Sequence, residues 1–357
     1  MPFLAYVSFA IVALAVLLYV LMDGWDLGVG ILFLIAAREQ ERDEMMESIA
    51  PFWDGNETWL VFGGVTLFAA FPAVYALTLQ ALYLPVMVML FALVFRGISF
   101  EFRSHSKDSK TLWNWAFALG SIIAAFSQGM VLGKLVQGVR LQHGPYGQTF
   151  TITLFPLLCG MAMVSGYALL GSAWLVYKTD GATQIFGREV SRAAWLLTIA
   201  LFIIACVWTP LSVAEVARRW FTLPGSLLFI ALAVALIAAS VAFWRSIWSS
   251  QSDARLLQLA VAMTVLAFVG FAGTIWPYAI PYRISIVEGA GDLVSIKFAL
   301  VGIVVVLPVV LTYQLYAYRV FGGKARDAEA LHGTSIPAPP GIHARRTHER
   351  EPRLHLT

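Results

Sequence analysis

Two carboxylates lie inside the first long apolar run of this chain, and they constrain its fold more than any other feature. Residues 2–37 are almost entirely apolar, yet Asp23 and Asp26 stand well inside them. Residues three apart share one face of a helix. A carboxylate at membrane depth is costly unless it faces protein, water or a partner. We therefore expect this face of the first helix to point into the protein, where Gly24 and Gly28 allow a neighbouring backbone to approach.

The composition predicts a membrane protein. The chain has 357 residues, of which 59% are hydrophobic and 13% charged, against about 25% charged in soluble domains. Apolar runs of about 20 residues recur along its length, which is typical of one polytopic helical domain. We predict an all-α fold with about nine transmembrane helices. Their ranges are 3–36, 52–75, 79–101, 114–137, 152–177, 194–212, 223–244, 256–279 and 291–320.

The first apolar run is too long for the h-region of a signal peptide, so we expect it to be a membrane span. Residues 1–321 are predicted to form a single transmembrane domain. Residues 322–357, rich in Pro, His and Arg, are predicted to be a disordered cytoplasmic tail.

The distribution of Lys and Arg predicts the orientation. With the amino terminus outside, the segments predicted to be cytoplasmic are 37–51, 102–113, 178–193 and 245–255. They carry ten basic residues, whereas the outer segments carry four. Cytoplasmic loops carry the excess of positive charge, so we expect an outer amino terminus and a cytoplasmic carboxyl terminus. The small net charge of +3 gives no reason to expect a nucleic-acid partner.

Polar residues open the second predicted span, at 51–60 (PFWDGNETWL). Asp54 followed by Glu57 fits a capping box at a helix amino terminus. In the other interpretation, Asp54, Asn56, Glu57 and Thr58 form a wet entrance into the protein from the cytoplasmic side. The two interpretations are compatible.

Arg96, in the third predicted span, lies about 8 Å inside the cytoplasmic boundary. It either extends to water or neutralises a buried acid. Asp26 lies about 15 Å deep and Asp23 deeper still. Asp54, Glu57, Arg96, Asp26 and Asp23 thus form a graded ladder of charges, and such ladders serve as proton relays.

Some chemistries have no basis in the sequence. The six histidines all lie outside the apolar spans, so two helices of this chain cannot hold a haem between histidines. Cys159 and Cys206 lie in apolar runs and suggest neither a disulfide framework nor a metal site. No phosphate-binding glycine-rich loop is present. We interpret the Trp and Tyr residues near span ends as an interfacial belt. They are Trp113, Trp115, Trp244, Trp248, Trp276, Tyr278, Tyr313, Tyr316 and Tyr318.

Several motifs resemble one known family, subunit II of the cytochrome bd-type ubiquinol oxidases. They are DGWDLGVG at 23–30, PFWDGNETWL at 51–60, FAAFPAVY at 68–75, FRGISFEFR at 95–103 and WPYAIP at 276–281. The resemblance extends to about Gly323 and includes all nine predicted spans.

The resemblance implies a respiratory terminal oxidase of the bacterial inner membrane. Such a complex oxidises ubiquinol near the outer face and reduces oxygen to water. Its protons come from the cytoplasm, so that turnover generates a membrane potential. Two b-type haems, one d-type haem and the quinol site belong to subunit I, to which this chain would bind. The resemblance also leaves room for a structural quinone and a small accessory subunit.

By the same resemblance, Asp54 matches the carboxylate of the family's proton path. Asp23, Asp26, Arg96 and Glu101 stand at matching polar positions, and Glu101 replaces an Asp found in some members.

Two other functions use the same residues differently. A secondary transporter would couple substrate movement to these carboxylates, although we find no clear inverted repeat. A purely structural assembly partner would need no ionisable residues at depth.

Overall fold

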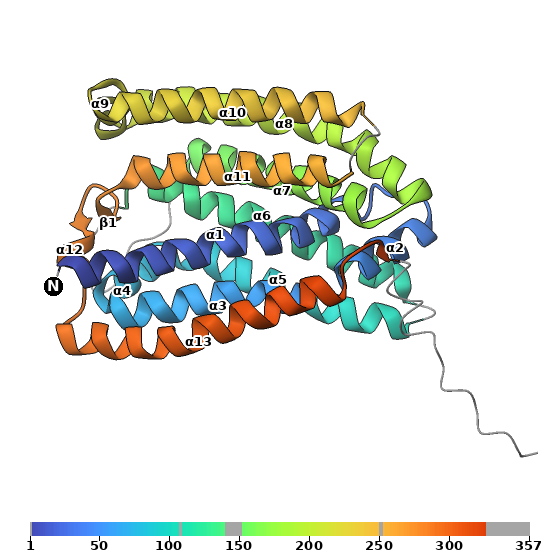
Figure 1. Cartoon of the computed structure of the whole chain (residues 1–357), viewed down its shortest axis with the longest axis horizontal. Helices are drawn as coiled ribbons and strands as arrows, with labels where there is room; N and C mark the ends of the chain where they lie inside the picture. The colour runs from blue at the N-terminus through green and yellow to red at the C-terminus, as the bar shows by residue number, and fades with distance from the viewer. Residues whose placement is uncertain (1, 107–108, 140–151, 250–252, 326–357) are drawn as a thin grey trace, which may run out of the picture.

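Long helices lie side by side along one axis of the molecule (Figure 1). The computed structural model describes residues 2–106, 109–139, 152–249 and 253–325. The long helices are α1 (Pro2–Leu32), α3 (Trp53–Ala70), α5 (Tyr83–His105), α6 (Lys110–Gln137), α7 (Leu154–Lys178), α8 (Gly181–Ser212), α10 (Gly225–Ile247), α11 (Asp253–Ile275) and α13 (Leu293–Val320), and the shorter α4 (Pro72–Ala81) follows α3. The short elements are α2 (Glu39–Ile49), α9 (Ala214–Phe221), α12 (Ile286–Gly289) and an antiparallel hairpin of β1 (Tyr278–Ile280) and β2 (Ile284–Ser285).

The all-α, polytopic membrane fold is confirmed. Within the described residues, eight helices are long and apolar enough to cross a membrane. The remaining predicted span, 52–75, corresponds to α3 and the start of α4. Helix α3 packs against α1 and α13, but its polar first turns reduce its hydropathy. The count of nine spans therefore stays a prediction.

Several predicted boundaries were wrong. Helix α1 ends at Leu32 instead of residue 36, and α8 begins at Gly181 instead of residue 194. The segment 39–49, expected within a loop, forms α2 because Met45, Met46 and Ile49 make an apolar face that is buried. Pro72 begins a new helix, α4, because proline has no amide hydrogen to continue α3.

The segments predicted to be cytoplasmic gather at one end of the bundle. This end carries α2 and the carboxyl-terminal end of α13, while the amino terminus lies at the opposite end with α9 and α12 (Figure 1). The arrangement agrees with alternate crossing of a membrane, and the orientation itself stays a prediction. Of the predicted tail, residues 326–357 lie outside the described part of the chain.

Helix α1 is the central element. It packs against α3, α6, α7 and α13, and residues 23–32 are all buried. Its closest neighbour is α7, since a Cβ atom on Gly28 would overlap the backbone of Tyr167 and Gly171. A Cβ atom on Gly171 would likewise overlap the backbone of Gly28. This glycine pair allows the two helices to cross in direct backbone contact.

Replacing Gly171 with alanine should destabilise the protein by about 1–3 kcal/mol, because the added methyl group forces α1 and α7 apart. Gly166→Ala is the matched control on the same helix, since its Cβ would meet no atom within 4 Å. The measurement is the thermal unfolding of the protein purified in detergent. Equal melting temperatures for the two variants would contradict the proposed close crossing.

Candidate functional site

A buried ion pair joins α1 to α5. Arg96 is 1% exposed, and Asp23 and Asp26 are fully buried. The Arg96 Nη1 atom lies 2.8 Å from Asp23 Oδ1, and Nη2 lies 4.0 Å from Asp26 Oδ2. Arg96 therefore neutralises buried acid instead of extending to water, which decides between the two roles that the sequence left open.

Asp26 is held by an amide from α3. Asn56 Nδ2 donates a hydrogen bond of 2.7 Å to Asp26 Oδ2. Asn56 Oδ1 accepts in turn from the hydroxyl of Tyr318 on α13, at 2.9 Å. Gln314, also on α13, accepts from Trp59 Nε1 at 2.7 Å and donates to the Gly55 carbonyl at 2.8 Å. Helices α3 and α13 thus form one polar assembly beside the acids.

Glu57 links this buried site to the surface. Its Oε2 atom lies 3.9 Å from Arg96 Nη1, and its side chain is 27% exposed. Asp54 lies in the first turn of α3 and is exposed. The capping-box interpretation was wrong, because the residue at the N-cap position is Phe52 and no side chain caps the helix. Exposure therefore falls from Asp54 through Glu57 to Asp23 and Asp26.

Glu101 is placed differently. It is exposed and lies five residues beyond Arg96 on α5, or about 7.5 Å along the helix axis. Asp26 is also nearer the helix end than expected, since α1 stops at Leu32, which is about 9 Å away along the axis. The structure thus brings Asp23, Asp26, Glu57 and Arg96 together and leaves Glu101 at the surface.

Four buried polar atoms of this cluster have no hydrogen-bond partner within the described protein: Asp23 Oδ2, Asp26 Oδ1, Arg96 Nε and Arg96 Nη2. Unpaired buried polar atoms are costly, and ordered water commonly satisfies them. Three carboxyl groups also surround one guanidinium, and full ionisation would leave excess negative charge in a buried site. The cluster is therefore suited to bind water and to take up protons.

Aromatic side chains pack beside the site, toward α7 and α13. Trp25 stacks on Trp174 with ring centroids 5.0 Å apart, and Phe52 stacks on Tyr318 at 4.4 Å. Tyr318 was assigned to the interfacial belt, and that assignment was wrong: its hydroxyl is bonded to Asn56 in the interior. Tyr313 and Tyr316, by contrast, are 63% and 67% exposed.

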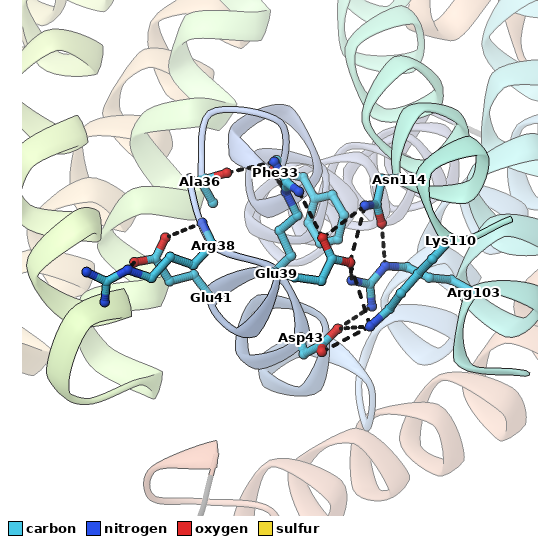
Figure 2. Close-up of polar contacts among 10 residues, drawn as sticks. Phe33, Ala36, Arg38, Glu39, Glu41, Asp43, Arg103, Lys110 and Asn114 are labelled. Carbon is cyan, nitrogen blue, oxygen red and sulfur yellow. Dashed lines mark hydrogen bonds and ion pairs between the residues drawn. The ribbon is translucent and has the colours of Figure 1, made fainter. Parts of the chain in front are cut away.

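A second polar cluster, which the sequence analysis missed, fastens α2 to the bundle. The side chains of Arg103, Lys110 and Asn114 converge on Glu39 and Asp43 (Figure 2). Arg103 is buried, and its two terminal nitrogens lie 2.7 Å from Glu39 Oε1 and 2.7 Å from Asp43 Oδ1. Lys110 Nζ lies 3.0 Å from Asp43 Oδ1. The cluster joins α2 to the ends of α5 and α6.

These contacts change the acidity of Glu39. Partial burial alone would raise its pKa, but hydrogen bonds from Arg42 and Asn114 outweigh this effect. Together with the charges of Arg103 and Lys110, they hold the pKa of Glu39 below its usual value.

Metal-binding side chains are not clustered in the described residues. Among them, no group of three or more His, Cys, Asp or Glu side chains could hold a metal ion. His105 is the one histidine in the described ranges, and it lies exposed at the end of α5. The other histidines are outside the described residues.

Comparisons with known proteins agree with one another. The sequence profile of a family described as cytochrome bd terminal oxidase subunit II matches residues 4–321. The cytochrome bd-I ubiquinol oxidase subunit 2 of Escherichia coli K12 is 33% identical over 215 residues, which is 57% of each chain. A probable cytochrome oxidase subunit 2 of Haemophilus influenzae is 33% identical over 216 residues and is covered to 57%. The chain thus spans little more than half the length of these two relatives.

A more distant relative is covered almost completely. The cytochrome bd ubiquinol oxidase subunit 2 of Bacillus subtilis is 26% identical over 338 residues, which is 90% of this chain and 97% of that protein. A chain in the structure of bd oxidase from Geobacillus thermodenitrificans superimposes with a TM-score of 0.74 at 16% identity, over 90% of this chain and 99% of that one. That structural match supports the fold alone.

Replacing Arg96 with methionine should destabilise the protein by about 3–5 kcal/mol, because Asp23 would be left buried without its cation. The double variant Arg96→Met with Asp23→Asn should recover much of this loss. Arg245→Met is the control, since Arg245 is exposed. Thermal unfolding of the unmodified protein, of Arg96→Met and Asp23→Asn alone, and of the double variant gives the coupling between the two residues. Additive losses in the double variant would contradict the pairing.

The lowered pKa of Glu39 makes the attachment of α2 sensitive to acid. A carboxylate with a depressed pKa in the folded state contributes stability above its unfolded pKa, and this contribution is lost as the pH falls through the folded value. Protection factors for hydrogen exchange in α2 should therefore be constant from pH 8 to about 5.5 and fall below about pH 4.5. In Glu39→Gln this decline should be weaker. A decline that begins above pH 6 would contradict the assignment.

Proposed function

This chain belongs to the cytochrome bd terminal oxidase subunit II family, and from this premise we propose that it is the haem-free second subunit of a quinol-oxidising, oxygen-reducing complex. Its apolar helices and its family make it a multi-pass protein of the bacterial inner membrane. The complex would oxidise ubiquinol and reduce oxygen to water. Protons for the water would be taken from the cytoplasm, which generates a membrane potential.

The haems of such a complex, two b-type and one d-type, would reside in subunit I. The one histidine in the described residues of this chain lies exposed at a helix end, so these residues offer no pair of buried histidines to hold a haem. The haems supply the electron transfer to oxygen, and the contribution of this chain is to support subunit I and to supply protons.

The proposed proton route begins at Asp54, which collects protons at the exposed start of α3. Glu57 passes them inward, since its carboxyl group is partly exposed and lies 3.9 Å from Arg96. Asp23 and Asp26 form the inner end. The observation that carries this proposal is the graded burial of the acids, which ends at buried carboxylate oxygens without partners.

Arg96 has two tasks in this route. Its positive charge makes a carboxylate at membrane depth tolerable. Because one guanidinium faces three carboxyl groups, protons can be shared among Asp23, Asp26 and Glu57 without a large net charge. Ordered water between these groups would complete the connections.

We place subunit I against the exposed face formed by α3 and α5. On α3, Val61, Val65 and Phe68 are 62%, 60% and 58% exposed. Phe91 and Phe95 on α5 are 60% and 58% exposed. Asp54 and Thr58 continue the α3 stripe toward its polar end, where bound subunit I would shelter the entrance of the route.

The two alternatives are weaker. A secondary transporter would use the same acids, but family membership favours the oxidase. A purely structural subunit would need no charge at membrane depth, yet Asp23, Asp26 and Arg96 are fully or almost fully buried.

Replacing Asp54 with asparagine should lower oxygen uptake by about tenfold or more, because general acid–base groups typically contribute at least that much. The measurement is quinol-driven oxygen uptake of the complex purified through a tag on this chain. Glu57→Gln should act in the same direction. Glu288→Gln is the control, because Glu288 lies in α12 at the opposite end of the bundle.

A reduced-minus-oxidised absorption spectrum shows that each variant is assembled. The tagged complex should show haem b and haem d bands with a co-purifying subunit, and the chain expressed alone should show none. A colourless complex would contradict the oxidase proposal. Unchanged oxygen uptake in Asp54→Asn, with normal haem bands, would favour the structural role.

A further inference from the structure

A chain of hydrogen-bonded polar side chains, two buried tyrosines joined by a half-buried glutamine, lies beyond Asp23, and the proton route described above does not use it. Tyr167 on α7 donates its hydroxyl hydrogen to Gln128 Oε1 on α6, at 2.6 Å. Gln128 Nε2 donates to the hydroxyl oxygen of Tyr19 on α1, at 2.8 Å. Tyr167 and Tyr19 are 2% and 4% exposed. Three neighbouring helices therefore contribute to one directed hydrogen-bond chain.

The direction of this chain leads to Asp23. Because the oxygen of Tyr19 accepts from Gln128, its own hydrogen is free to donate. Asp23 follows Tyr19 by one helical turn on the same face of α1, and the two groups interact electrostatically. Asp23 Oδ2 is buried and has no hydrogen-bond partner in the described protein. It is the acceptor to which the free hydrogen of Tyr19 can be directed.

Asp26 also lies at the end of a hydrogen-bond chain, but the last donor in that chain is a neutral amide. Tyr318 donates to Asn56, and Asn56 donates to Asp26. Asp26, however, receives only a neutral amide hydrogen, and its distance of 4.0 Å from Arg96 is too long for a hydrogen bond. Asp23 is hydrogen-bonded to Arg96 at 2.8 Å. Hydrogen bonds to charged groups are roughly twice as strong as neutral ones, so the two carboxyl groups have unequal environments.

We propose that Tyr19, held by Gln128 and Tyr167, is a positioning residue that keeps Asp23 as the ionised partner of Arg96, so that Asp26 is the acid that takes up and releases protons. This inference rests on the proposed proton route and assigns different roles to its two innermost acids. Gln128 sets the orientation of Tyr19 and does not pass protons itself, because its donor and acceptor are different atoms of one neutral amide.

The charged and titratable groups that interact with Asp23 and Asp26 come from five packed helices. Helix α1 contributes Tyr19, Asp23 and Asp26, and α5 contributes Arg96. The other groups that interact with these acids are Glu57 from α3, Tyr167 from α7 and Tyr318 from α13. Arg96 is the one cation among them, and it makes its hydrogen bond to Asp23. The additional hydroxyl of Tyr19 would reinforce this preference.

The test is infrared spectroscopy of the assembled complex at neutral pH, in which a protonated carboxyl group gives its own carbonyl band. In the unmodified complex such a band is expected from Asp26, and Asp26→Asn should remove it. Tyr19→Phe should add a band equivalent to one carboxyl group, and combining it with Asp23→Asn should remove that band. Gln128→Leu should act like Tyr19→Phe, because Tyr19 then loses its orientation.

Tyr282→Phe is the control. It also removes a tyrosine hydrogen bond, to the Val136 carbonyl, but away from the acids, and its spectrum should be unchanged. All variants are compared at equal haem content, so that loss of folding is recognised.

Two results would overturn the inference. If Tyr19→Phe and Gln128→Leu give the unmodified spectrum, Tyr19 does not position Asp23. If the original band is lost in Asp23→Asn or Glu57→Gln instead of Asp26→Asn, the assigned roles are wrong. Neither result contradicts the proposed proton route, because that route is tested separately by the oxygen uptake of Asp54→Asn.

Discussion

The contact between Arg96 and Asp23 is the interaction on which the rest of the structure depends. A carboxylate in the middle of an apolar bundle needs a partner, and a guanidinium from the neighbouring α5 provides it at 2.8 Å. Both residues of this pair are buried, and α1, which carries Asp23, packs against α3, α6, α7 and α13. The backbone contact between Gly28 and Gly171 brings α7 against α1, and Trp25 stacks on Trp174 across the same pair of helices.

The surroundings of this pair differ from side to side. Toward α7 and α13, aromatic rings stack against one another. Toward the start of α3, Glu57 is 27% exposed. At the end of the bundle, Arg103 binds Glu39 and Asp43 and so fixes α2 across the loops. The acids therefore face one partly open side, and this asymmetry is what the proposed proton route requires.

Much of this arrangement could be predicted from the sequence, because only a few structures can accommodate long apolar runs that contain charged residues. The inward face of α1 and the graded burial of the acids followed from residue type and depth alone. The identity of the contacts did not, because helix packing depends on details such as the glycine crossing. Tyr318 was mistaken for an interfacial residue, since position in a span does not reveal which face a side chain occupies.

Some of the residues that form hydrogen bonds around the acids could also have been found from the sequence. Gln128 and Gln314 lie within apolar spans, and an amide at such a position indicates a buried hydrogen bond. The α2 cluster could not be found in this way. Charged residues near a loop usually face solvent, and only the fold brings Arg103 to Glu39. The apolar face of α2 was the available signal for that helix.

The most direct test of the central claim is a high-resolution electron cryo-microscopy map of the complete complex. The account predicts ordered water bound to Asp26 Oδ1 and Arg96 Nη2, connected through Glu57 to Asp54 at the cytoplasmic surface. A dry site, in which apolar side chains of the partner subunit separate Glu57 from the buried acids, would contradict it.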